Sequence, residues 1–208
     1  GTGSNATIGH GLGKKPNIIF LKDLDNLKSW VVYTSVLGAS ASLNLNTSDG
    51  KATGITEFQS AEPTTTVFSL GTDSNVNGSS QRYIAYCFAE IQGYSKFGTY
   101  IGNGSTDGAF AYTGFTPAFI IRKYADGGEQ WNIHDTTRTP NNENTTYLYT
   151  STNGAEGSSS NLALDILSNG FKMRNGDGAG NGSGRTYVFI AFAESPFGGI
   201  LTNEATAR

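Results

Sequence analysis

The sequence predicts an all-β protein made of two tandem, internally duplicated β-sandwich modules. Three observations lead to this prediction. Landmark residues of the first half recur in the second, segments rich in glycine, asparagine and serine separate short apolar runs, and no stretch shows the apolar spacing of a helix. Many short strands joined by such turns are typical of sandwiches and not of helical or mixed folds.

The repeat holds a fixed offset over a long stretch. Eight landmarks recur 101 positions later, as the pairs Gly1 and Gly102, Gly3 and Gly104, Ser4 and Ser105, Gly13 and Gly114, Pro16 and Pro117, Ile19 and Ile120, Lys22 and Lys123, Trp30 and Trp131. Further along, "NGSSQRYIAYCFAE" (77–90) matches "NGSGRTYVFIAFAE" (181–194) at an offset of 104, and the three extra residues are expected in a loop. We therefore predict one module at 1–101, in which 91–101 is the connecting segment, and a second at 102–208.

The strand after the repeated proline is assigned its inward face from the differences between the copies. Ile18 and Phe20 remain apolar at the corresponding positions, whereas Leu21 is replaced by Arg122. Because charged side chains are rarely buried, Ile18 and Phe20 are expected to face the core.

The same comparison places tryptophan in the core. Trp30 recurs as Trp131, whereas Tyr33, at a position of the opposite phase, becomes His134. We therefore expect both tryptophans to face inward, and the alternate positions to face outward.

One strand of each module is predicted to be central. The segments "RYIAYCFAE" and "TYVFIAFAE" are apolar on both faces, as a strand covered on each side requires. Phe88 and Phe192 are expected to be core residues of these strands, and Cys87 is expected to act as a small apolar residue.

Composition excludes several classes of partner. A formal net charge of −3 with no cluster of lysine and arginine argues against nucleic acid and against attraction to an acidic membrane surface. No apolar run reaches the roughly 18 residues of a spanning helix, so no membrane insertion is expected. The single cysteine cannot form an internal disulfide. Because the sequence begins with glycine and not methionine, we expect a longer or processed polypeptide.

No catalytic constellation is visible, and the chain is predicted not to be an enzyme. His10 and His134 are the only histidines and lie in different modules, without partners for a triad or a metal site. Asp23 and Asp25 are expected in an edge or turn, although paired carboxylates of this kind keep a polysaccharide-degrading enzyme open as a third reading. We predict no metal, no cofactor and no catalytic residue.

Candidate contacts for a ligand or an interface come from loop aromatics and from one polar patch. The aromatic candidates are Tyr94, Phe97, Tyr100, Phe110 and Tyr112. His134 and Asp135, close to Trp131, could form a carbohydrate-contacting patch, because aromatic faces and short polar side chains suit sugars. Interface packing explains the aromatics equally well.

Four stretches carry a resemblance to a known family: "GNGSTDGAFAYTGFTPAFIIRK", "LSNGFKMRN", "GRTYVFIAFAESPFG" and the ending "NEATAR". They resemble a tandem β-module family found at the C-terminal end of virion structural and tail-fibre proteins of tailed bacteriophages, many of them marine. The resemblance covers essentially the whole chain and brings no catalytic residues.

The resemblance implies a location and a role. It implies a non-enzymatic protein of the virion surface, made in the host cytoplasm and built into a tail fibre, spike or appendage that serves structure and host attachment. Expected partners are copies of the same chain, with a trimer favoured, other virion proteins, and host surface polysaccharide. The alternatives are a stand-alone carbohydrate-binding module and a capsid-decoration or filament protein.

Overall fold

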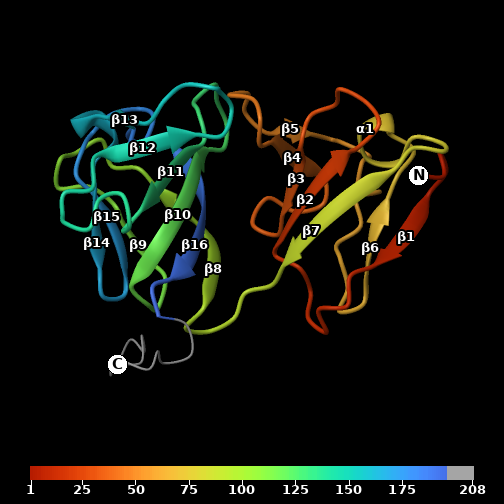
Figure 1. Ribbon diagram of the computed structural model, residues 1–208, viewed down its shortest axis with the longest axis horizontal. Helices are drawn as coiled ribbons and strands as arrows, with labels where there is room; N and C mark the ends of the chain where they lie inside the picture. Colours follow the sequence, from red (N-terminus) through yellow and green to blue (C-terminus); the bar gives the residue numbers. More distant parts are fainter. Residues whose placement is uncertain (196–208) are drawn as a thin grey trace. The chain divides into compact units, whose positions relative to one another are not determined.

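The computed structural model describes residues 1–195 and is almost entirely β, with 39% strand and 4% helix (Figure 1). The predicted all-β class is confirmed. The chain divides into two compact units, Gly1–Ala89 and Glu90–Arg208. The ending "NEATAR" (203–208) lies outside the described residues. No helix in the described part is long and apolar enough to cross a membrane.

The first unit contains two antiparallel sheets. Its elements are β1 (Ala6–Gly9), β2 (Ile18–Asp23), β3 (Val31–Thr34), β4 (Ala41–Asn44), β5 (Ala52–Thr53), β6 (Val67–Leu70), the short helix α1 (Ser74–Asn77) and β7 (Tyr83–Phe88). β1 pairs with β6, and the larger sheet has the order β5-β4-β3-β2-β7. The turn after β2 closes because the Asp23 carboxylate accepts from the backbone N–H groups of Asp25 and Asn26, which confirms a turn role for Asp23.

The second unit contains a six-stranded and a three-stranded sheet. Its elements are β8 (Ser95–Ile101), β9 (Phe110–Tyr112), β10 (Pro117–Tyr124), β11 (Asn132–Asp135), β12 (Thr146–Tyr149), β13 (Gly157–Ser158), the 3-10 turn η1 (Ser160–Leu162), β14 (Leu164–Leu167), β15 (Gly170–Met173) and β16 (Thr186–Ala193). The larger sheet has the order β13-β12-β11-β10-β16-β8, and the smaller has the order β14-β15-β9.

Residues 91–101, predicted to connect the modules, instead contribute a strand to the second unit. β8 runs antiparallel to β16 over seven residues, from Thr186 opposite Ile101 to Phe192 opposite Ser95 (Figure 1). The compact unit accordingly begins at Glu90. The physical reason is that a buried strand such as β16 requires hydrogen-bond partners along both of its edges.

The core of the first unit lies on the opposite strand face from the one predicted. Ile19, Leu21, Val31 and Tyr33 form the buried cluster together with side chains of β6. Ile18 is completely buried, as predicted, but lies outside the cluster, and Phe20 is only half-buried and also lies outside it. The prediction failed because both faces of these strands are apolar, so the alternation of side chains does not identify the inner face.

The core of the second unit joins side chains from both of its sheets. Phe171 and Leu164 of the smaller sheet pack with Ile120, Tyr187 and Phe189 of the larger one. All five are at most 2% exposed. These aromatic and aliphatic side chains supply the burial that stabilises a unit with no disulfide bond.

Candidate functional site

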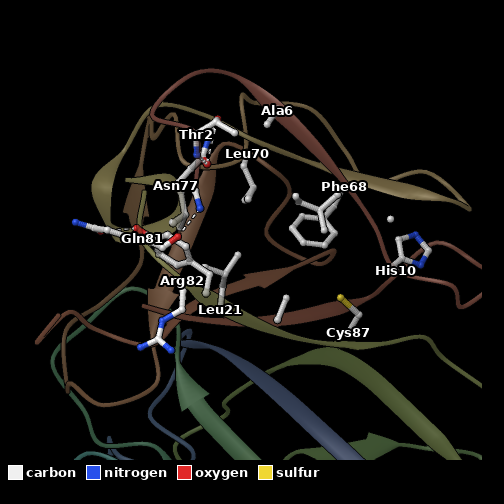
Figure 2. Close-up of a pocket in the computed structure, with 16 residues that line it drawn as sticks. Thr2, Ala6, His10, Leu21, Phe68, Leu70, Asn77, Gln81, Arg82 and Cys87 are labelled. Atoms are coloured by element: carbon white, nitrogen blue, oxygen red, sulfur yellow. Dashed lines mark hydrogen bonds between the residues drawn. The ribbon is translucent and has the colours of Figure 1, made fainter. Parts of the chain in front are cut away.

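The first unit contains an open cavity of about 670 Å³ between its two sheets. Figure 2 shows Phe68 and Leu70 pointing into it from β6, with Leu21 on the opposite side and Cys87 near one end. Ala6 and other residues of β1 complete the lining. The interior therefore presents mostly apolar side chains.

One side of this cavity is formed by β7, which is an edge strand. Leu24 N–H donates to the Arg82 carbonyl across 2.9 Å, which sets the alternation of hydrogen-bonded pairs between β2 and β7. By that alternation the backbone groups of Tyr83, Ala85 and Cys87 point away from β2. Among the strands of the described residues, none pairs with this outer edge. The prediction that this strand is central is therefore wrong for the first unit.

The corresponding edge of the second unit is covered. At the 104-residue offset, Tyr187 and Phe189 of β16 correspond to Tyr83 and Ala85 of β7. The ring of Tyr100, on β8, stacks on Tyr187 with centroids 4.9 Å apart, while Phe189 meets Phe171 edge-on at 5.3 Å. The space that is open in the first unit is filled by aromatic rings in the second.

Two titratable side chains of the cavity wall, Cys87 and Tyr83, are affected by their burial. Burial raises the pKa of the Cys87 thiol and, as the largest of several contributions, that of the Tyr83 hydroxyl. Arg82, at the rim, is bound to Asp25 through a 2.6 Å ion pair. The Cys87 and Tyr83 side chains are therefore kept neutral, and Arg82 is already paired. His10 and Gly1 also line the cavity.

A different feature, which is polar, lies inside the second unit, where Arg122 and His134 are completely buried. Arg122 donates from Nη2 to the Leu162 carbonyl at 2.8 Å and to His134 Nε2 at 3.3 Å. Its Nη1 lies 3.1 Å from the sulfur of Met173 and 3.5 Å from the Tyr100 hydroxyl. Within the described part of the chain, no carboxylate forms a salt bridge with this guanidinium.

His134 is held neutral in this cluster. Burial, followed by the positive charge of Arg122, lowers the pKa of His134 to about 3. Because Nε2 accepts from Arg122, the ring proton is assigned to Nδ1, which then donates to the Asn144 side-chain oxygen at 3.3 Å. Asn144 in turn donates to the Asp135 carbonyl at 2.9 Å. The chain of donors and acceptors is continuous and closed to solvent.

The structure separates the predicted aromatic contacts into buried and exposed groups. Phe97 and Tyr100 are buried, at 4% and 6% exposure, and Tyr94 is half-buried. Phe110 and Tyr112 are 44% and 56% exposed and stand two residues apart on β9, so they share one face. Of the five candidates, these last two are the exposed ones.

The predicted patch of His134 and Asp135 is not a surface patch. His134 has no exposed area, and the carboxylate of Asp135 is occupied by the Arg138 backbone and guanidinium at 2.8 and 2.5 Å. The reason is the same phase error, since the alternate positions of β11 face inward. The Asp135 carboxylate holds the local turn to Arg138.

The four residues predicted to lie in the core differ in their burial. Trp131 is completely buried, as expected. Trp30 is half-buried and stacks on Tyr86 with centroids 6.3 Å apart, so its assignment to the core is wrong. Phe88 and Phe192 are likewise half-buried, outside the clusters that form the cores.

Sequence reasoning missed the buried polar residues, although a signal for them was present. The counterparts of Leu21, Val31 and Tyr33 in the second unit are polar, on alternate positions of two neighbouring strands. Such a joint replacement is a signal of polar residues that are buried together. Arg122 and His134 contact each other, whereas Asn132 donates to the Gln130 carbonyl at 3.0 Å. The prediction that these positions face outward is therefore wrong, because Arg122, Asn132 and His134 are all completely buried.

Within the described residues, no group of three or more histidine, cysteine, aspartate or glutamate side chains is placed to hold a metal ion. Residues 1–196 match the model of a family described as a domain of unknown function, DUF7483. No curated protein and no solved structure matches the chain.

Proposed function

The chain belongs to the DUF7483 family of domains of unknown function, and we propose that it is a non-catalytic structural module made of two copies of one β-sandwich repeat. Its proposed setting is the virion surface of a tailed phage, in a tail fibre, spike or appendage. The sequence resemblance to virion structural proteins supports this setting, and the repeat-related contacts described next support the architecture.

The observation that carries the proposal is a buried asparagine in each unit whose amide donates to the backbone carbonyls of a loop. We call this contact the loop lock. Asn77 donates from its amide to the Ser4 and Gly71 carbonyls at 2.7 and 2.8 Å. Asn181, 104 residues later, donates to the Ser105 carbonyl at 2.9 Å and the Asn175 carbonyl at 2.6 Å. Both amides are almost completely buried. The same side chain therefore fixes the same glycine-rich segment twice.

A repeated lysine supports the same interpretation. Lys22 donates its ammonium to the carbonyls of Asp23, Asn26 and Lys28, at 2.8 to 3.2 Å. Lys123 donates to the carbonyls of Tyr124 and Gly127, both at 2.7 Å. In each unit the charge is used to close the loop after a strand, which favours a rigid scaffold over a chemical site.

The proposed module is a homotrimer on the virion surface, so its mass in solution and its location on the particle test the proposal. Light scattering on the purified protein at a few micromolar should give three times the mass of one chain. Antibodies raised against it should label the outside of intact virions of the phage that encodes it. A monomer at every concentration contradicts the oligomer, and labelling only of disrupted particles contradicts the surface location.

A carbohydrate-binding role is the second candidate, and the exposed pair on β9 favours it. Phe110 and Tyr112 place two accessible rings on one face of a strand that ends its sheet. Aromatic rings with an accessible face suit the apolar faces of sugar rings. A glycan array probed with the wild type and with a Phe110→Ala and Tyr112→Ala double variant tests this role. Binding that the double variant loses supports it, and an array without signal for the wild type contradicts it.

A further inference from the structure

We propose that the outer edge of β7 accepts an additional strand, supplied by a polypeptide segment joined to the Gly1 nitrogen, with a bulky apolar side chain over Ala85. This inference is independent of the virion role, because it rests on the backbone of β7 and on the cavity beside it. The expected strand runs antiparallel to β7, as β8 runs antiparallel to β16.

The first step concerns the unpaired backbone of β7. Edge strands present rows of free N–H and C=O groups that pair readily with another strand. Here those groups belong to Tyr83, Ala85 and Cys87, whose side chains also line the apolar cavity. A small molecule could fill the cavity but could not satisfy the row of backbone groups, whereas a strand satisfies both.

The second step concerns the position of Gly1. In the second unit β8 leads directly into Gly102, whose N–H donates to the Arg185 carbonyl and whose carbonyl accepts from Gly184 N–H, both at 2.9 Å. Gly1 occupies the corresponding place. Its amino group donates to the Gln81 carbonyl, and its carbonyl accepts from Ser80 N–H at 3.0 Å. A segment joined to the Gly1 nitrogen is therefore aimed along the free edge of β7.

The geometry around both glycines is alike in detail. A Cβ atom added to Gly102 would lie 2.3 Å from the Gly182 carbonyl oxygen, and one added to Gly1 would lie 2.1 Å from that of Gly78. Contacts this short exclude any side chain at either position. The entry point of the strand is thus built the same way in the two units.

The third step gives the chemistry of the strand. Opposite Phe189, β8 carries Gly98, where an added Cβ would lie 2.7 Å from the Phe189 ring. The counterpart of Phe189 in the first unit is Ala85. The small residue of the pair therefore lies on β7 there, and the large one can lie on the accepted strand. With about 670 Å³ open beside Ala85, the central residue of the accepted strand is expected to be large and apolar.

The test extends the full 208-residue chain at Gly1 with eight residues. The first, the glycine extension, copies Tyr94–Ile101. The second, the phenylalanine extension, has phenylalanine in place of the glycine that copies Gly98. A third carries proline at the positions whose N–H groups would pair with β7. Amide hydrogen exchange at Ala85 and Cys87, together with maleimide labelling of the Cys87 thiol, reports the occupancy of the edge.

We expect the phenylalanine extension to slow exchange and labelling at least about tenfold, and more than the glycine extension does. The proline extension should change neither, because it cannot donate to the edge. Absence of protection by the phenylalanine extension overturns the proposal. Protection by the free eight-residue peptide but not by the joined segment overturns the proposed source of the strand.

An Ala85→Phe variant provides the matched control. With phenylalanine at position 85, the glycine extension should protect the edge and the phenylalanine extension should lose its advantage. If the two extensions protect the edge in the same order with alanine and with phenylalanine at position 85, the size complementarity is contradicted. Unchanged exchange protection at Ile19 and Leu21, in the core of the same unit, shows that the variant is folded.

Discussion

Arg122 Nη2 lies 3.3 Å from His134 Nε2, and neither side chain has any exposed area. The guanidinium is held by neutral acceptors: the imidazole, a tyrosine hydroxyl, a methionine sulfur and the Leu162 carbonyl. Within the described residues no carboxylate balances it by a salt bridge. Protonation of His134 would place a second positive charge beside the first, so the stability of the second unit depends on a neutral imidazole.

This dependence predicts a pH effect with a definite sign. The pKa of His134 is about 3 in the folded protein and about 6.5 when unfolded, so the unfolded chain binds the extra proton as pH falls below 6.5. The contribution is fully present above pH 6.5 and is lost at about 1.4 kcal/mol per pH unit towards pH 3. Urea unfolding followed by Trp131 fluorescence in a Trp30→Phe background measures it.

A His134→Gln variant serves as the control for this pH effect. It removes the titrating group, and its free energy of unfolding should vary less steeply between pH 6 and pH 4 than that of the parent. The difference between the two slopes isolates His134 from carboxylates that titrate in the same range. Identical slopes would show that the imidazole is not held neutral.

Removing the buried cation should destabilise the protein even though leucine fits the corresponding position of the first unit. Arg122→Leu leaves the Leu162 carbonyl and His134 Nε2 without their donor, which we expect to cost about 1–3 kcal/mol in the free energy of unfolding. A double-mutant cycle with His134→Gln should give a coupling of roughly 0.5–3 kcal/mol. A coupling of zero would show that the two side chains do not act together.

The loop locks predict matched losses in the two units. Asn77→Ala and Asn181→Ala each remove a buried amide and leave backbone carbonyls unpaired, so each should cost about 1–3 kcal/mol. Asn153→Ala, at an exposed loop position, is the control and should stay within about 0.5 kcal/mol of the wild type. Hydrogen exchange at the core amides of each unit measures the change in that unit's free energy of unfolding. A cost at only one of the two asparagines would argue against equivalent roles.

Cys87 should react slowly in the folded protein. Burial raises the pKa of its thiol, and the thiolate is the reactive form. Labelling with iodoacetamide at pH 8 should therefore be slower than for the same chain in urea, and it should accelerate as the pH is raised further. Equal rates in the two states would mean that the cavity wall does not shield the thiol.

Much of the fold was accessible from the sequence. The all-β class followed from the spacing of apolar residues, and the turn role of Asp23 followed from local chemistry, because a carboxylate bonds to backbone groups two and three residues ahead. The inner faces of the strands were not accessible. Phe20 and Leu21 are both apolar, and only the packing of β6 over one face selected Leu21 for the core.

The sequence by itself determined where landmarks recur and which segments form strands, because these depend on residue type and local spacing. Tertiary structure decided how two corresponding strands are paired. β16 is covered by β8 and lies within its sheet, whereas β7 ends its sheet beside an open cavity. The physical reason is that strand pairing joins residues far apart in the chain, so the partner of an edge cannot be inferred from the strand itself.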